Sequence, residues 1–149
     1  MVVAVVILAL AGCTSSTPPV SKPEAAKDFT AAYKSFLVGG QAILKEDPLP
    51  TATHPEPHRP TFAEDSQIAN RVDRYRKSLT SISWPQPAGR DAGAVESALS
   101  KEATEVRSIE GVSDTNPVLG TDYRNLASTE KTELTAENRL RRALGLPRR

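Results

Sequence analysis

Residues 61–82, TFAEDSQIANRVDRYRKSLTSI, carry the clearest structural pattern of the chain. Apolar side chains recur there at alternating spacings of four and three, the period of one helix face: Ile68, Val72, Tyr75, Leu79 and Ile82. Thr61-Phe62-Ala63-Glu64 has the form of a capping box, in which a hydroxyl and a carboxylate bind backbone N–H groups where a helix begins. We therefore expect a helix over residues 62–82 that packs on other helices along this seam.

The opposite face of this segment is basic. It carries Arg71, Arg74, Arg76 and Lys77. Basic side chains on one face of a helix usually point to water, and we expect this face to be solvated. Asp73 and Lys77 have the i,i+4 spacing of a surface ion pair.

Three further segments show helical spacing of apolar residues. The first, residues 23–46, follows a second capping box at Ser21-Lys22-Pro23-Glu24. Inside it, Gly39-Gly40 indicates either a close contact with another helix or a kink. The next, residues 92–110, follows Asp91 as a candidate N-cap and precedes Gly111 as a candidate C-cap.

The last helical segment is residues 121–144, and Gly145-Leu146-Pro147 after it has the form of a Schellman stop. Its expected apolar face is Tyr123, Leu126, Ala127, Leu134, Leu140 and Leu144. Polar residues 128–133 interrupt this face, so we expect the middle of the helix to pack weakly. A weakly packed middle is also where a partner could dock.

The fold class follows from these four segments. No strand pattern or internal repeat is visible, and the connections are short. We expect an all-α, up-down-up-down four-helix bundle over residues 23–149. The formal net charge of +1 makes nucleic acid an unsuitable partner.

The beginning of the chain has the pattern of a targeting segment. An apolar run, Val2 to Leu10, ends in Leu10-Ala11-Gly12-Cys13, which contains the only cysteine. The run is too short to span a bilayer, which takes about 20 apolar residues, and this motif resembles the lipobox of bacterial lipoproteins. The absence of a basic residue before the run indicates that the natural start lies upstream. A buried strand with an incidental cysteine is the alternative.

The lipobox resemblance implies a signal peptide over residues 1–12, a lipidated Cys13, and a flexible tether over residues 13–22. The expected location is the extracytoplasmic face of the cell membrane, with membrane lipid as a partner through the acylated cysteine. The region from Trp84-Pro85 to Leu144-Gly145-Leu146-Pro147 also looks like a group of small actinobacterial helical lipoproteins of uncharacterised function. That resemblance implies an extracytoplasmic helical bundle and supplies no activity.

Two sets of residues are candidate sites. His54, Glu56 and His58 lie in a proline-rich loop and could ligate a metal ion, although a simple solvated loop is the expected alternative. A second set would lie at the tethered end of the bundle and could contact phospholipid headgroups. It comprises Trp84, Arg90, Arg139, Arg141, Arg142, Arg148 and Arg149. These arginines could instead serve as helix C-terminal charges, and Trp84 could cap the core.

The sequence favours a non-catalytic scaffold or accessory protein of the cell envelope, with an envelope protein as its partner. The alternative is a binding module for a small ligand, lipid or metal ion between the helices. A cavity lined by Phe29, Tyr33, Phe36 and Tyr75 would favour that alternative. We predict no catalytic residues and no cofactor. Glu102, Glu105, Glu130 and Glu133 have spacings that usually mean solvation, and only a cleft that brought two of them together would indicate an enzyme.

Overall fold

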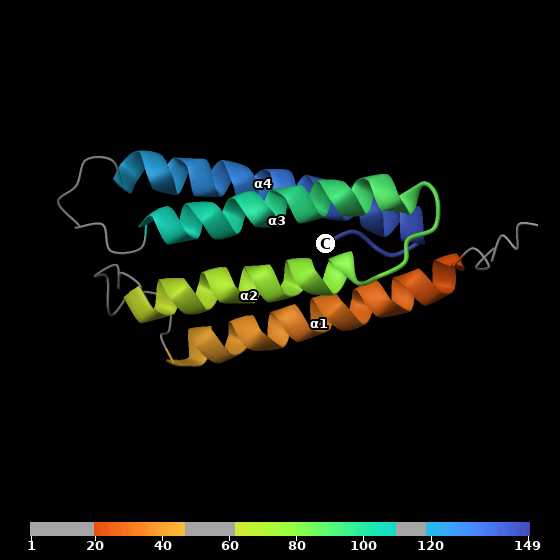
Figure 1. Cartoon of the computed structure of the whole chain (residues 1–149), viewed down its shortest axis with the longest axis horizontal. Helices are drawn as coiled ribbons and strands as arrows, with labels where there is room; N and C mark the ends of the chain where they lie inside the picture. Colours follow the sequence, from red (N-terminus) through yellow and green to blue (C-terminus); the bar gives the residue numbers. More distant parts are fainter. Residues whose placement is uncertain (1–19, 47–61, 110–118) are drawn as a thin grey trace, which may run out of the picture.

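The computed structural model describes residues 20–46, 62–109 and 119–149, and these form four α-helices. They are α1 (Lys22–Glu46), α2 (Phe62–Thr80), α3 (Ala88–Ile109) and α4 (Leu119–Leu144). Successive helices run in opposite directions, so the predicted up-down-up-down bundle is confirmed (Figure 1). The same ranges contain no strand. None of the helices in them is long and apolar enough to cross a membrane.

The helices do not pack equally. Helix α3 packs closely against both α2 and α4, and α1 packs against α2, whereas α1 and α4 touch only sparsely. The bundle is therefore closed on three sides and loosely closed on the fourth. This fourth side, between α1 and α4, is where the polar features described below are found.

The apolar core follows the predicted seam. Val72, Tyr75 and Leu79 of α2 are buried, and Leu99 of α3 and Leu140 of α4 lie in the same cluster. Aromatic rings that pack on one another, some stacked and some edge-on or tilted, extend the core toward α1. The ring pairs are Phe29 with Tyr33, Tyr33 with Tyr75, Phe36 with Tyr75, and Phe29 with Trp84.

Two predicted helix ends are confirmed by their hydrogen bonds. At the start of α1, the Glu24 N–H donates to Ser21 Oγ at 3.4 Å, as a capping box requires. At the end of α4, the Leu146 N–H donates to the Arg141 carbonyl at 2.8 Å, and the Gly145 N–H donates to the Arg142 carbonyl at 3.1 Å. With Gly145 at φ 79°, this is a Schellman motif. Thr61 and Gly111, the other predicted caps, lie outside the described residues.

The predicted bounds were wrong at α3, which begins at Ala88 rather than at residue 92. The turn after α2 already has helical hydrogen bonds, because the Gly89 N–H donates to the Pro85 carbonyl and the Arg90 N–H to the Pro87 carbonyl. Asp91 is therefore inside the first turn, where its charge favours the helix dipole, and is not an N-cap. Helix α2 begins at Phe62, as predicted, and ends two residues earlier than predicted; α4 begins two residues earlier than predicted.

Helix α1 runs through Gly39 and Gly40 without a break, so the close-contact interpretation of this pair is the right one. A Cβ atom on Gly40 would lie 2.9 Å from Cζ of Arg71 in α2, too close for any real pair of atoms. The missing side chain thus makes room for a guanidinium group. The Arg71 guanidinium lies 4.5 Å from the centre of the Phe36 ring.

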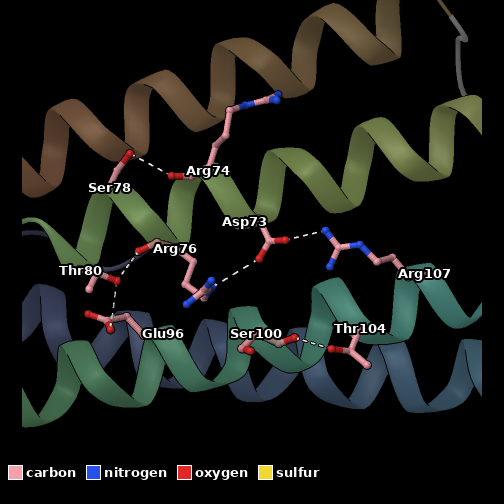
Figure 2. A network of polar contacts seen from close by, with 9 residues as sticks. All are labelled: Asp73, Arg74, Arg76, Ser78, Thr80, Glu96, Ser100, Thr104 and Arg107. Carbon is pink, nitrogen blue, oxygen red and sulfur yellow. Dashed lines mark hydrogen bonds and ion pairs between the residues drawn. The ribbon is translucent and has the colours of Figure 1, made fainter.

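The expectation of a solvated basic face on α2 was wrong for Arg71, which is half-buried against α1. Asp73 does not pair with Lys77 either. It accepts hydrogen bonds from Arg76, at 3.4 Å, and from Arg107 of α3, at 2.5 Å (Figure 2). A bond across the α2–α3 interface is geometrically available because α3 lies directly beside α2. The Arg107 hydrogen bond is the main cause of the lowered pKa of Asp73.

Candidate functional site

The inward face of α4 is polar, contrary to prediction. The buried residues of this helix are Thr129, Glu133, Ala136, Glu137, Leu140 and Leu144. Tyr123 is 44% exposed and Ala127 is exposed, although both were expected on the apolar face. The polar residues interrupt the apolar pattern because they themselves face the bundle, at i,i+4 spacing from Thr129 through Glu133 to Glu137.

Glu137 is the most deeply buried charged side chain of the described residues, with 0% exposure. Its carboxylate accepts a hydrogen bond from Arg141 Nε at 2.6 Å and another from Arg149 Nη1 at 2.9 Å. Arg141 comes from the next turn of α4. One carboxylate thus holds two guanidinium groups, and charge-assisted hydrogen bonds of this kind are among the strongest in proteins.

Arg149 reaches Glu137 because the chain reverses after α4. The Schellman motif turns residues 145–149 back along the bundle, as the dark blue segment after α4 shows (Figure 1). The backbone N–H of Arg149 donates to Asn138 Oδ1 at 2.9 Å, and Arg141 Nη1 donates to the Pro147 carbonyl at 3.4 Å. The segment therefore lies on the loosely closed side of the bundle.

Aromatic rings of α1 cover the two guanidinium groups. The Arg141 guanidinium lies 4.6 Å from the centre of the Tyr33 ring and 5.4 Å from that of Phe29. The Arg149 guanidinium lies 5.7 Å from the Tyr33 ring centre. These are cation–π distances, and contacts of this type strengthen when water is excluded.

Glu133, one turn before Glu137, is a buried acid with only 7% exposure. Burial raises its pKa to about 8, helped by a hydrogen bond to Glu137 and by the charge of that carboxylate. At neutral pH Glu133 is therefore mostly protonated and donates to Glu137. Glu137 accepts from both Arg141 and Arg149, so the hydrogen in the bond between the two acids comes from Glu133.

A second acid approaches from α3. Burial raises the pKa of Glu102 to about 7, with a further contribution from the charge of Glu130 on α4. Arg71 opposes this shift without cancelling it. Two carboxyl groups near the middle of the bundle can thus each hold a proton close to neutral pH.

These groups line a cavity of about 610 Å³ on the α1–α4 side. Its apolar lining is Phe36, Leu37, Leu99, Ala127 and Leu134, and its charged lining is Arg71, Glu102, Glu130, Lys131, Glu133 and Arg149. Gly40 completes the wall. Of the four aromatic residues that would have marked a ligand cavity, only Phe36 lines it, because the other three rings pack against each other.

Buried polar atoms that have no hydrogen-bond partner within the described part of the chain include Arg71 Nε, in the cavity wall, Tyr75 Oη, and Thr129 Oγ1 on the inward face of α4. Buried polar atoms are usually paired, and each unpaired one costs about 1–3 kcal/mol. The arrangement can hold or release protons and can bind a polar group that enters the cavity.

The structure does not bring together all of the sequence-predicted site residues. Cys13, His54, Glu56 and His58 lie outside the described residues. Trp84 is half-buried and packs edge-on against Phe29. Of the proposed surface arginines, Arg90, Arg139, Arg142 and Arg148 are exposed. Arg141 and Arg149 both bind the buried Glu137 carboxylate, Arg141 with 12% of its side chain exposed and Arg149 with 41%.

Sequence reasoning missed Glu137 and Arg71 as interior residues, and it treated Glu133 and Glu102 as solvated. One signal was available: Glu137 and Arg141 have the i,i+4 spacing of an ion pair on the side of α4 that also carries Leu140 and Leu144.

Within residues 20–46, 62–109 and 119–149, no three His, Cys, Asp or Glu side chains come together in a way that could hold a metal ion. Comparison of the chain with protein-family models, with curated proteins and with solved structures finds no match. The geometry of the cavity is therefore the main basis for a functional proposal.

Proposed function

We propose that this chain is a lipid-anchored lipoprotein of the extracytoplasmic membrane face whose helical bundle binds a small polar ligand in the α1–α4 cavity. The anchor part of the proposal rests on Leu10-Ala11-Gly12-Cys13 and the apolar run before it. The binding part rests on the cavity and its charged lining.

The observation that carries the binding proposal is the position of the acids. Stability alone does not require this buried network, because a buried ion-pair network can often be replaced as a whole by apolar residues of similar volume without loss of stability. Ionisable groups with shifted pKa values that gather in a cavity are typical of binding and active sites. The cavity also meets the condition set above for an enzyme, because Glu102, Glu130 and Glu133 all line it, and ligand binding is the step that either function would need first.

The binding proposal is tested with the full lipoprotein, purified in mild detergent from bacterial membranes and examined by native mass spectrometry. Ala127→Trp should fill the cavity, since Ala127 lines it from an exposed position. Ser128→Trp is the matched control, because Ser128 is exposed and does not line the cavity. We expect a small-molecule adduct on the natural chain and on the control and none on Ala127→Trp. An adduct that survives on Ala127→Trp, or none on the natural chain, would refute the proposal.

The anchor is tested separately by metabolic labelling with a palmitate analogue. The natural chain should carry the label and enter the membrane fraction, and Cys13→Ala should lose both properties. Ser15→Ala, two residues away in the same tether, should keep both. Labelling that persists in Cys13→Ala would contradict the lipobox interpretation.

A scaffold role is the second candidate, and exposed apolar residues of α1 favour it. Leu37 is 44% exposed and Val38 is 58% exposed. Val38 also lines a groove of about 530 Å³ between α1 and α2. If a partner protein docks there, Val38→Asp should abolish its crosslinking in membranes. Ala31→Asp, at an exposed position of the same helix, should not.

A further inference from the structure

Acidic and basic side chains gather at the cavity and at Glu137 beside it. The acids are Glu102, Glu130, Glu133 and Glu137, and the cations are Arg71, Lys131, Arg141 and Arg149. All but one of these groups belong to the helices. Arg149 alone is delivered by the segment that folds back after α4.

Arg149 stands between Glu137 and the cavity. Its guanidinium binds the fully buried Glu137 carboxylate at 2.9 Å, and its side chain is also part of the cavity wall. Its side chain is 41% exposed, whereas the Arg141 side chain on the same carboxylate is 12% exposed. Removal of the Arg149 side chain would open a path from the cavity to an ionised carboxylate.

The place that Arg149 occupies suits a guanidinium group. The Glu137 carboxylate offers Oε2 as an acceptor, and the Tyr33 ring offers a face 5.7 Å from the guanidinium carbon. A planar cation can use both at once, since guanidinium groups stack on aromatic faces while their edges donate hydrogen bonds. A compact ammonium group would be less well matched to this pair of contacts.

Few contacts hold the Arg149 side chain itself, whereas its segment is fixed at several points. The segment is held by the Schellman bonds of Gly145 and Leu146, by the packing of Leu146 against the core, and by the Arg149 N–H bond to Asn138. Glu137 and Tyr33 hold the side chain. A competitor for these two side-chain contacts could therefore displace it without unfolding a helix.

We propose that the place between Glu137 and Tyr33, at the edge of the cavity, is a guanidinium-recognition site that Arg149 occupies in the free protein, and that a ligand bearing a guanidinium group takes its place. The inference rests on the proposed function, in that it assigns a ligand class to the part of the site that Arg149 separates from the cavity. The ligand is either a free small molecule or an arginine side chain of a peptide.

A tethered competitor weakens the binding of any free ligand. Short flexible tethers give effective concentrations on the order of millimolar. An external guanidinium group should then bind at least about tenfold more tightly once the competitor is removed. This difference can be measured without knowledge of the natural ligand.

The experiment is a titration of the full chain with methylguanidinium, followed by NMR chemical shifts. Arg149→Ala removes the internal competitor, and Arg148→Ala is the matched control because Arg148 is an exposed neighbour. Methylurea has the same shape without the charge and is the control probe. We expect methylguanidinium to bind Arg149→Ala at least tenfold more tightly than the natural chain or Arg148→Ala, with shifts centred on Tyr33 and Glu137. Methylurea should not bind.

Equal affinity for Arg149→Ala and Arg148→Ala, or equal shifts with methylurea, would overturn the proposal. A loss of folding in Arg149→Ala would be visible in its NMR spectrum. If Arg149→Ala does not fold, the test uses the natural chain instead. Saturating methylguanidinium should shift the Arg149 Nε resonance toward that of a free side chain. A resonance that does not move would overturn the proposal.

Two further experiments distinguish a free guanidinium ligand from an arginine side chain of a peptide, and test the ligand class separately from the proposed binding function. Acetyl-arginine-amide presents the same cation as part of a peptide, and its affinity relative to methylguanidinium shows which source the site prefers. The Ala127→Trp adduct experiment reports on the cavity as a binding site whatever the ligand is. An adduct lost in Ala127→Trp without guanidinium binding in Arg149→Ala would reject the ligand class and keep the proposed function.

Discussion

Replacing Glu137 with glutamine should destabilise the protein strongly, although the change keeps the side-chain volume. Glu137→Gln removes the negative charge that faces Arg141 and Arg149 at 2.6 and 2.9 Å. The Arg141 side chain is 12% exposed and cannot reach water without disturbing Phe29 and Tyr33. Breaking a buried ion pair at one partner costs about 3–5 kcal/mol.

One feature reduces that figure: Arg149 is 41% exposed and can swing into water. We therefore expect the free energy of unfolding to fall by about 2–4 kcal/mol, a large share of the 5–15 kcal/mol typical of a domain.

The assay is urea unfolding of the unlipidated chain, followed by circular dichroism at 222 nm. Glu130→Gln is the matched control, because Glu130 is an exposed glutamate of the same helix, and its cost should stay within about 0.5 kcal/mol. A cost below about 1 kcal/mol for Glu137→Gln, indistinguishable from the control, would refute the buried ion-pair network.

A double-mutant cycle measures the interaction energy between Glu137 and Arg141 apart from the effect that each substitution has on its surroundings. Arg141→Met removes the cation and keeps an unbranched apolar side chain. The double variant should cost less than the sum of the single variants, with a coupling energy of about 1.5–3 kcal/mol. Strict additivity would mean that Glu137 and Arg141 do not interact in solution.

Three other predictions follow from pKa shifts, glycines and caps. Between pH 4.5 and about 8 the folded chain keeps a proton on Glu133 that the unfolded chain has released. The free energy of unfolding should therefore fall as pH rises, by up to about 1.4 kcal/mol per pH unit. Urea melts at several pH values should show this slope, and a rise in stability over this range would contradict it. Glu133→Gln should remove the Glu133 share, whereas the share of Glu102, whose pKa is raised to about 7, should remain below pH 7. Gly40→Ala should cost about 1–2 kcal/mol because it pushes Arg71 off its site, whereas Gly93→Ala should stabilise the protein by about 0.5–1 kcal/mol, since a Cβ there meets nothing within 4 Å. If the melting temperatures of Gly40→Ala and Gly93→Ala both rise, or both fall, relative to the natural chain, the packing described at Gly40 is contradicted. Ser21→Ala should lower stability by about 0.5–1 kcal/mol through loss of the α1 cap, and an unchanged melting temperature would count against that cap.

The fold could be predicted from the sequence because it depends on repeated, local signals. The apolar seam from Val72 to Leu79 and the hydrogen-bonding pattern of Gly145-Leu146 are each set by a few neighbouring residues. Four such segments with short connections leave few ways to bury their apolar faces. The start of α3 was missed because the turn before it is itself helical in its hydrogen bonds.

The candidate site could not be predicted because it breaks the rule on which the sequence prediction depended. Periodicity assigns apolar residues to the inside, and α4 instead turns Glu133 and Glu137 inward and leaves Tyr123 partly exposed. The compensating cations are not local: Arg149 arrives by chain reversal, and Arg71 comes from another helix. Only the three-dimensional arrangement shows that these charges meet.

The orientation of Glu133 and Glu137 distinguishes a polar cavity from an ordinary solvated helix face. It is tested most directly by an NMR titration of the carboxyl carbons of chains with labelled glutamate, assigned with Glu133→Gln. We expect the Glu133 carboxyl to titrate near pH 8, far above the ordinary pKa of 4.5. A Glu133 carboxyl that titrates near pH 4.5 would place the middle of α4 in water and contradict both the cavity and the function proposed for it.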